Sequence, residues 1–477
     1  MRLEFIGGAS TVTGSCFNLR VNNLNFLVDC GMHQGNGGES ETLDRKAFPF
    51  DPAKIDFVFV THAHMDHSGM LPRLKREGFK GKIFTTQATK DLLKPMLVDS
   101  ARIQQSDADW QTRKAARAGL PPIEPLYTEA DVAAVLPMFE QRDYAKLYHL
   151  GSGVKYRFID AGHILGSATL ELWFQDSERE KKIVFSGDIG KKGNPILKDP
   201  SMPDEADYVV MESTYGNRLH RPLRQSVDEL ASAIKTTFKR GGNVYIPTFA
   251  LGRTQDILYI LNGLAAEGRL FNINVHLDSP LAEEATKIYL AHPECFDEEA
   301  KKLFEAAGRN GAPDKGKSMF SSMKTGALKL HFTHTVDESM LLNRLKSGHI
   351  IMAGSGMCEG GRIKHHLKHN LWRRECSVVF VGFQARGTLG RRIVDGAKTV
   401  SILGEEIAVR AQIHTINGFS AHADRHELFE WLTALSNSPK VFLVHGEEEA
   451  AESLGKFIQE KTGLETHRPR DGEVVEL

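Results

Sequence analysis

Short apolar runs and alternating apolar and polar positions fill the first 60 residues, and this pattern predicts β-strands. Strands are expected at residues 2–6, 15–21, 25–28 and 55–61, separated by Gly or Asn turns. Helical patterns then run from about 89 to 118 and from 129 to 139, and strands return at 154–160, 168–174, 182–186 and 208–212. Strands, then helices, then strands indicate an αββα sandwich of two sheets with helices outside.

From about residue 213 the pattern changes to an alternation of strands and helices. Strands are expected at 243–247, 273–277, 349–353 and 377–382, and helices at 252–267, 282–291 and 361–371. Such alternation is typical of a parallel sheet. A glycine-rich loop is expected inside this block at 308–317. Near residue 400 short strands resume at 398–403, 406–414 and 440–445, before a last helix to about 461.

We therefore predict an α/β protein in which one domain is split around another. Residues 1–209 form the first part of an αββα domain, residues 210–385 form an inserted parallel-sheet domain, and residues 386–477 complete the first domain. A length of 477 residues with 41% hydrophobic and 25% charged residues supports more than one core and excludes general disorder. No run of 18 apolar residues predicts a membrane-spanning helix, and the first residues lack the apolar stretch of a secretory signal.

Charge and cysteine content limit the possible environments. Lys and Arg number 60 and Asp and Glu number 61, so any nucleic-acid binding must rest on a local basic patch. The five cysteines include no CxxC pair, which favours a reducing cytoplasm over a disulfide framework. The 20 histidines are the one compositional oddity.

The strongest chemical signal is the cluster His62-Ala-His64-Met-Asp66-His67 at the end of the strand expected at 55–61. Three imidazoles and a carboxylate within six residues are difficult to explain as packing. Imidazole nitrogen and carboxylate oxygen are ligands that zinc accepts. On a turn after a strand, His62 and His64 can bind one ion while Asp66 and His67 bind a second.

Other expected strands also end in His or Asp, and these residues are candidates for the remaining ligands. His163 follows the strand at 154–160, Asp188 follows the strand at 182–186, and His445 ends the strand at 440–445. A carboxylate at Asp188 can bridge two cations. Asp29, which follows the strand at 25–28, is a candidate for orienting a ligand or a bound water. Each residue alone could be incidental, but together they indicate one metal centre.

The metal cluster resembles that of the metallo-β-lactamase superfamily, and further motifs are similar to its β-CASP branch. That branch includes RNase J and the pre-mRNA 3′-end-processing endonuclease. Glu212 in ESTYG, His422 in FSAHAD and His445 look like motifs A, B and C of the branch. PTFALGR at 247–253, GSGMC at 354–358 and GFQARGT at 382–388 match it as well. The resemblance covers essentially the whole chain.

The resemblance implies a role for each matching residue. His62, His64 and His163 would bind one zinc ion, and Asp66, His67 and His445 the other, with Asp188 bridging both. Asp66, Glu212 and His422 would be catalytic, with Glu212 orienting His422 as a general acid. A His at motif C accompanies RNA substrates in the branch, whereas DNA-repair members carry Val, so His445 favours RNA.

RNA- or phosphate-binding residues are expected in the inserted block and beside His422. Glycine-rich turns before helices can bind phosphate through backbone amides, although a tight strand–helix connection explains them equally well. The basic stretch that begins at Arg362 could line an RNA groove, or it could be an ordinary solvated face. The candidates are Arg253, Ser355, Gly356, Arg362, Lys364, Arg386, Ser420 and Ala421.

These observations predict a cytoplasmic, zinc-dependent ribonuclease with two zinc ions. A metal-bound hydroxide in the cleft between the two domains would attack phosphorus and leave a 5′ phosphate and a 3′ hydroxyl. Cleavage could be endonucleolytic or 5′→3′ exonucleolytic. The alternatives are a DNA nuclease of the same branch, a small-molecule metallohydrolase, and a scaffold subunit without chemistry. RNA is the expected partner, no membrane is expected, and a homodimer is an allowed assembly.

Overall fold

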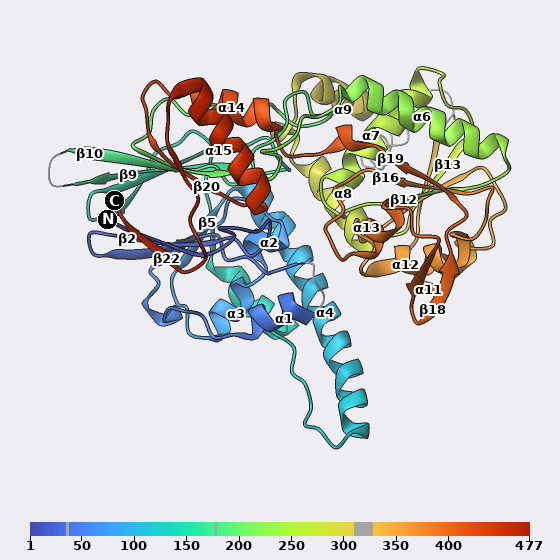
Figure 1. Ribbon diagram of the computed structural model, residues 1–477, viewed down its shortest axis with the longest axis horizontal. Helices are drawn as coiled ribbons and strands as arrows, with labels where there is room; N and C mark the ends of the chain where they lie inside the picture. Colours follow the sequence, from blue (N-terminus) through green and yellow to red (C-terminus); the bar gives the residue numbers. More distant parts are fainter. Residues whose placement is uncertain (35–37, 177–178, 310–327) are drawn as a thin grey trace. The chain divides into compact units, whose positions relative to one another are not determined.

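The computed structural model describes residues 1–34, 38–176, 179–309 and 328–477, which fall into two compact units (Figure 1). The first unit comprises Met1–Lys192, Asp199–Leu219 and His422–Leu477. The second comprises Gly193–Lys198 and His220–Ala421. The first unit is therefore discontinuous in sequence.

Two mixed sheets face each other in the first unit. The first has the order β22 (Glu473–Glu476), β1 (Arg2–Gly7), β2 (Cys16–Val21), β3 (Leu24–Val28), β4 (Phe57–Phe59), β5 (Lys82–Thr85) and β6 (Phe139–Gln141). The second has the order β21 (Thr466–His467), β20 (Lys440–Val444), β11 (Tyr208–Glu212), β10 (Glu180–Phe185), β9 (Ala168–Gln175), β8 (Val154–Asp160) and β7 (Tyr148–Gly151).

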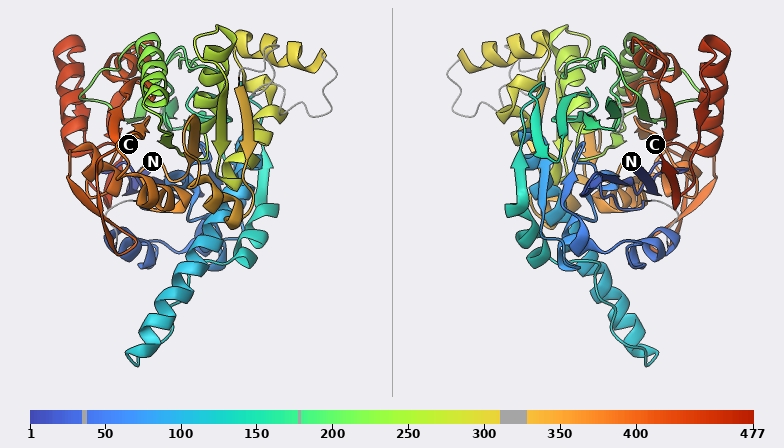
Figure 2. Two further views of the ribbon diagram at one scale, coloured as in Figure 1. Left: turned by 90° about the vertical axis from the view of Figure 1, so that its right-hand side faces the viewer. Right: turned by 90° about the vertical axis from the view of Figure 1, so that its left-hand side faces the viewer.

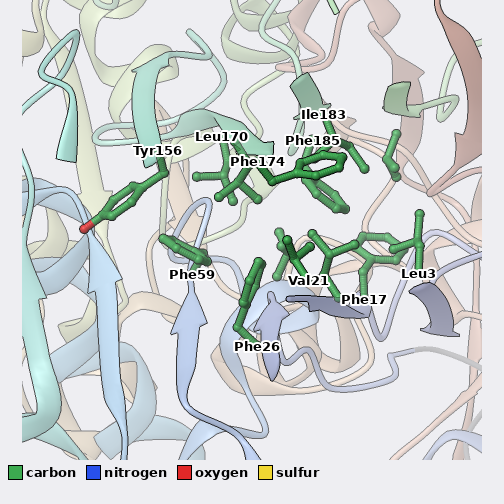
Figure 3. Close-up of a cluster of buried hydrophobic side chains, with 14 of the residues drawn as sticks. Leu3, Phe17, Val21, Phe26, Phe59, Tyr156, Leu170, Phe174, Ile183 and Phe185 are labelled. Carbon is green, nitrogen blue, oxygen red and sulfur yellow. The ribbon is translucent and has the colours of Figure 1, made fainter. Parts of the chain in front are cut away.

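Buried side chains from both sheets form the core between them (Figure 3). Phe17, Phe26 and Phe59 come from the first sheet, and their neighbours Tyr156 and Phe185 come from the second. The ring of Phe59 packs edge-on against Tyr156 at 4.8 Å, and Phe17 lies 6.0 Å from Phe185. Alternate positions along each strand supply these side chains, as expected for sheets packed face to face.

Helices cover the outer faces of the sandwich. Apolar side chains of α14 (Arg425–Thr433) and α15 (Glu448–Thr462), such as Trp431 and Leu454, pack on Val209 and Leu443 of the second sheet. The remaining helices of this unit are α1 (Gly38–Arg45), α2 (Met65–Ser68), α3 (Leu71–Arg76), α4 (Gln87–Arg117) and α5 (Glu129–Val135). The αββα sandwich expected from the sequence is confirmed.

The second unit is built on a parallel sheet. Its order is β14 (Leu328–Phe332), β13 (Ile273–Leu277), β15 (His349–Ala353), β12 (Val244–Pro247), β16 (Ser377–Phe380) and β19 (Gln412–Thr415). Every pairing in it is parallel. A separate hairpin joins β17 (Thr399–Ile402) and β18 (Glu405–Ala408).

Helices pack around this parallel sheet. α12 (Gly361–Asn370) and α13 (Leu389–Val394) bury Ile363, Leu367 and Ile393 against Ile351 and Val378. α6 (Leu223–Lys239) contacts β16, and α7 (Arg253–Ala266) contacts β14. The other helices are α8 (Pro280–Ala291), α9 (Glu298–Arg309) and α11 (Val336–Leu342). None of the helices in the described ranges combines the length and apolar content needed to cross a membrane.

The segment expected to form one strand at 406–414 forms two strands instead. β18 belongs to the small hairpin, whereas β19 extends the parallel sheet beside β16. Between them the backbone amides of Arg410 and Ala411 both donate to the carbonyl of Leu371, which turns the chain. Contacts consequently group residues 386–421 with the inserted sheet, which differs from the expected boundary at 385.

Two further expectations differ from the observed elements. The helix expected at 129–139 ends at Val135, and Pro137 occupies a 3₁₀ turn before β6 begins at Phe139. The loop expected at 308–317 lies mostly outside the described residues.

Candidate metal centre

The HxHxDH turn presents four side chains in two directions because a short helix begins within it. His62 lies on the extended segment after β4, and His64 is the N-cap of α2. Asp66 and His67 lie on the single turn of α2 itself. A Cβ at Gly31 would lie 1.7 Å from the carbonyl oxygen of Asp66, so only glycine lets the β3 loop pack against this turn.

One ligand group combines His62, His64, His163 and Asp188. Nδ1 of His64 lies 3.1 Å from Nε2 of His62 and 3.3 Å from Nε2 of His163. Oδ2 of Asp188 lies 3.4 Å from Nε2 of His62 and 3.5 Å from Nε2 of His163. Ligands about 2.0–2.1 Å from a tetrahedral zinc are separated by about 3.3 Å, so these atoms fit a zinc ion.

A second group combines Asp66, His67 and His445. Nε2 of His445 lies 3.1 Å from Nε2 of His67 and 3.4 Å from Oδ2 of Asp66. His445 follows β20 and adopts a φ of 45°, a conformation that is rare outside glycine. The strand end and this backbone conformation together direct the imidazole toward α2.

Asp188 lies between the two groups. Oδ2 contacts the first group, whereas Oδ1 lies 3.3 Å from Nε2 of His67 in the second. The carboxylate is buried, and Oδ1 accepts no hydrogen bond. A buried carboxylate oxygen without a donor is unfavourable unless a cation balances it, so the chemistry of this residue fits a metal site.

Burial keeps the imidazoles of His62, His64 and His163 neutral, whereas Asp188 and Asp29 outweigh burial at His67 and raise its pKa. Burial and then the nearby His67 together lower the pKa of His62 to about 3, although Asp188 acts in the opposite direction. Burial likewise lowers the pKa of His64 to about 4. Neutral imidazole is the metal-binding form of histidine. Burial would raise the pKa of Asp188, but the facing histidines His445, His67 and His62 hold it well below its usual range.

Asp29 supports the second group from behind. Its Oδ2 lies 2.7 Å from Nδ1 of His67, which leaves Nε2 of that ring directed at Asp66 and His445. The Thr61 backbone amide and hydroxyl donate to Asp29 at 2.8 and 2.9 Å. These bonds hold Asp29 in a left-handed conformation with φ of 60°. The sequence did not single out Thr61, although it directly precedes the HxHxDH cluster.

Glu212 and His422 lie together at the end of β11. Nδ1 of His422 is 3.2 Å from both carboxylate oxygens of Glu212. Glu212 also accepts a hydrogen bond from the Ile189 amide at 2.6 Å, which fixes its carboxylate. Burial alone would lower the pKa of His422, but Glu212 and then Asp188 outweigh it and raise the pKa to about 9. Such a pKa favours the imidazolium form of His422 at neutral pH, and that form can donate a proton.

Thr214 is a further residue that sequence reasoning missed. Its Oγ1 lies 3.2 Å from Nδ1 of His445 and donates to the His445 carbonyl at 3.0 Å. This contact orients the imidazole so that Nε2 faces His67 and Asp66. Its position two residues after Glu212, in ESTYG, was the available signal.

The residues predicted to bind RNA lie in the second unit. Ser355 and Gly356 are in the loop after β15, where Gln384 donates to the Gly356 carbonyl at 3.0 Å. The loops after neighbouring strands β15, β12 and β16 thus pack together at the carboxyl ends of the parallel strands, where ligands bind in open α/β sheets. Arg386 is exposed in the loop after β16.

Several of these candidates have contacts within the protein. Arg253 is buried and pairs with Asp256 at 3.2 Å, and the guanidinium of Arg362 binds Asp278 at 2.6 Å. Lys364 donates to the Glu359 carbonyl at 3.1 Å. Ser420 is buried and, with Ala421, directly precedes His422. These contacts position the side chains, and RNA binding by them stays a prediction.

Fold and site together define a metallohydrolase of the metallo-β-lactamase type. Residues 10–163 match the metallo-β-lactamase superfamily, and residues 254–393 match the Beta-Casp domain. Residues 406–469 match the Zn-dependent metallo-hydrolase RNA specificity domain.

Similar proteins narrow the assignment. Ribonuclease TTHA0252 of Thermus thermophilus is 38% identical over 476 residues, covering 100% of both chains. An RNase J-like protein of Methanocaldococcus jannaschii is 30% identical and covers 100% of this chain and 99% of its own. Transcription termination factor FttA of Methanosarcina mazei is 31% identical over 100% of this chain and 72% of its own. The chain belongs to the β-CASP branch of the metallo-β-lactamase superfamily, as its motifs predicted.

One solved structure covers both units. A protein of unknown function from Enterococcus faecalis V583 aligns with 100% of this chain and 99% of its own at a TM-score of 0.54. With 12% sequence identity, it supports the fold alone.

Proposed function

We propose that the protein is a zinc-dependent ribonuclease that hydrolyses RNA phosphodiester bonds to leave a 5′ phosphate and a 3′ hydroxyl. The observation that carries the proposal is the Glu212–His422 pair beside the bridging carboxylate of Asp188, which lies 3.9 Å from His422. A metallohydrolase of small molecules needs the ligand groups but not this pair. The names of the relatives, ribonuclease and RNase J-like protein, support RNA as the substrate.

Two zinc ions are part of the proposal. His62, His64 and His163 would hold one, Asp66, His67 and His445 the other, and Asp188 both. When bound, zinc supplies Lewis acidity at the phosphate and lowers the pKa of a coordinated water.

Side chains of the protein would then transfer the protons of the reaction. His422 keeps 20% of its side chain exposed and Asp66 keeps 17%, whereas Asp188 and His445 keep no more than 4%. Substrate would therefore approach on the side of His422 and Asp66. As the bond from phosphorus to the 3′ oxygen breaks, His422 donates the proton from Nε2 to that oxygen while Glu212 holds Nδ1. Asp66 would orient the attacking water.

Further parts of the proposal concern the setting of the protein. Its five cysteines, all within the described residues, are buried and joined in no disulfide, which supports a reducing compartment such as the cytoplasm. A homodimer stays a prediction, and light scattering of the purified protein tests it.

The experiment compares three substrates with zinc-loaded protein: a single-stranded RNA, a DNA of the same sequence, and a chromogenic β-lactam. We expect cleavage of RNA and little or none of the others. Preferential DNA cleavage would favour the DNA nuclease alternative, and β-lactam hydrolysis without RNA cleavage would favour the small-molecule alternative.

A further inference from the structure

The long helix α4 begins beside the metal centre and its second half extends away from the sandwich of its own unit (Figures 1 and 2). The hydroxyls of Thr86 and Thr89 donate to the carbonyl of Gly166, at 2.7 and 2.8 Å, in the loop that carries His163. The first half buries Leu92, Leu93 and other apolar residues. Arg102 still pairs with Glu129 at the start of α5, at 3.0 Å, and beyond it the helix runs beside the returning segment 118–127 (Figure 1).

The returning segment covers one face of the projecting half. The Leu120 amide donates to the Ala115 carbonyl at 3.0 Å, and the Ile123 amide donates to the Thr112 hydroxyl at 2.9 Å. Ala108 and Ala115 are buried on this face. We call residues 102–120 the arm.

The opposite face of the arm carries exposed apolar side chains. Ile103 and Trp110, seven residues apart, are 54% and 59% exposed. This spacing places them on one stripe of the helix, and Lys114 and Arg117 continue it toward the tip. Leu120 at the tip is 62% exposed. Exposed apolar side chains that line up beside polar and charged residues form the kind of patch that marks an interaction site.

The end of the arm is strongly basic. Arg113, Lys114 and Arg117 are exposed, and no acidic residue occurs between Trp110 and Ile123. Among the ion pairs of the described residues none involves these three side chains, and Lys114 lies over the Trp110 ring at 5.5 Å. The three positive charges are thus available to a ligand.

We propose that the arm is an RNA-binding surface on which a base stacks on Trp110 and phosphates contact Arg113, Lys114 and Arg117. An aromatic ring among cations is the combination that binds single-stranded nucleic acid without sequence preference. Charge selects RNA over a second copy of the chain, because two arms would bring like charges together. The inference rests on the proposed function in taking RNA as the substrate.

The position of the arm predicts a dependence on RNA length. Trp110 lies 23 residues after the start of α4, about 35 Å along the helix at about 1.5 Å per residue. An RNA that contacts both the arm and the metal centre must span this distance. A trinucleotide is too short to do so, so the arm should affect long RNA and not a trinucleotide.

The test compares two variants with wild type. The arm variant combines Trp110→Ala with Arg113→Gln, Lys114→Gln and Arg117→Gln. The control removes three exposed cations elsewhere in the same unit, Lys46→Gln, Arg76→Gln and Lys80→Gln. Binding of a fluorescent RNA of about 25 nucleotides and of a trinucleotide is measured by anisotropy after chelation of metal, so that binding is read without cleavage. Because the substituted arm side chains are exposed, circular dichroism should show an unchanged fold.

We expect the arm variant to bind the long RNA about tenfold more weakly or worse, with a salt slope reduced by about two. The trinucleotide should bind equally to all three proteins, and Trp110→Phe should retain most of the affinity that Trp110→Ala loses. An unchanged affinity and slope, or an equal loss in the control, would overturn the inference. A change of oligomeric state with unchanged RNA affinity would also overturn it and assign the stripe to a second copy.

Binding and cleavage separate this inference from the proposed function. If wild type binds RNA through the arm but does not cleave it, the arm stands and the ribonuclease proposal fails. If wild type cleaves RNA but the arm variant binds it normally, the ribonuclease proposal stands and the arm inference fails.

Discussion

Both carboxylate oxygens of Glu212 lie 3.2 Å from Nδ1 of His422, and the Ile189 amide holds the same carboxylate. His422 forms an isolated antiparallel β-bridge with Gly190, and the Ala423 amide donates to the Ile189 carbonyl at 2.8 Å, so His422 is held beside the Asp188 loop. The final segment of the first unit therefore delivers a protonated histidine to the metal centre. Glu212 and His422, which are 210 positions apart in the sequence, thus form one proton-donating pair.

Replacing the proton donor should uncouple cleavage from metal binding. His422→Ala should lower the rate of RNA cleavage by about 10²–10⁴-fold, because a positioned general acid contributes about this much. Bound zinc, measured by elemental analysis, should stay at the wild-type level. Glu212→Gln should lower the rate of cleavage less than His422→Ala does. It should also shift the pH profile of cleavage, because the amide no longer favours the imidazolium form of His422. Full activity of zinc-loaded His422→Ala would remove His422 from the mechanism.

Asp29→Asn tests the support behind His67. Loss of the charged partner 2.7 Å from Nδ1 should weaken zinc binding by about 10–100-fold. Competition with a chromogenic chelator measures this affinity. The matched control is Asp56→Asn, since Asp56 also accepts a backbone amide, that of Asn25, but directly precedes β4, whereas the metal ligands follow the other end of that strand. Equal affinities in Asp29→Asn and wild type would contradict a supporting role.

The number of metal ions can be tested directly. Asp66 and His445 belong to the second ligand group, and neither is in the group that contains His62, His64 and His163. Asp66→Ala should therefore retain about one zinc ion per chain where wild type binds two, and a chelator should abolish cleavage in both. A wild-type protein saturated by a single ion would contradict the two-ion proposal.

A cluster of histidines in the second unit should make its stability depend on pH. Burial, followed by His331 and His349, lowers the pKa of His276 from 6.5 to about 4, against an opposing effect of Asp278. The folded protein keeps His276 neutral where the unfolded chain would protonate it. The contribution of neutral His276 to the free energy of unfolding is therefore present above pH 6.5 and is lost as the pH falls from 6.5 toward 4.

Denaturation of metal-free protein at several pH values measures this effect. After allowance for partial exposure of the ring, His276 should account for about 1–2 kcal/mol of the acid-induced loss of unfolding free energy. In the native structure Nε2 of His276 lies 2.9 Å from Nδ1 of His349, and the amide of a glutamine can replace this contact. His276→Gln should therefore lose correspondingly less unfolding free energy than wild type as the pH falls. Parallel curves for the two proteins would contradict the assignment.

Local pattern was sufficient for most elements of the fold. The strands at Tyr208–Glu212 and His349–Ala353 match the ranges expected from the sequence residue for residue. Each is a short buried apolar run, which periodicity reports well. Pairing partners were harder to predict, because β19 reads as an ordinary strand and only its hydrogen bonds to β16 place it in the inserted sheet.

In the candidate site, too, local features could be predicted from the sequence and contacts between distant residues could not. The HxHxDH cluster is contiguous, so its chemistry is visible in the sequence, and strand ends suggested His163, Asp188 and His445. Thr61 and Thr214 act through single hydrogen bonds that no spacing encodes. Arg362 looked like a free cation, yet the structure pairs it with Asp278 from another strand end.

The most direct test of the account is the cleavage of an end-labelled RNA by zinc-loaded wild type and zinc-loaded His422→Ala. Substrates with a 5′ phosphate and with a 5′ hydroxyl separate internal cleavage from removal of nucleotides at one end. We predict products with 5′ phosphate and 3′ hydroxyl termini from wild type and at least about 100-fold slower cleavage by the variant. Absence of RNA cleavage by wild type, or equal cleavage by both proteins, would contradict the account.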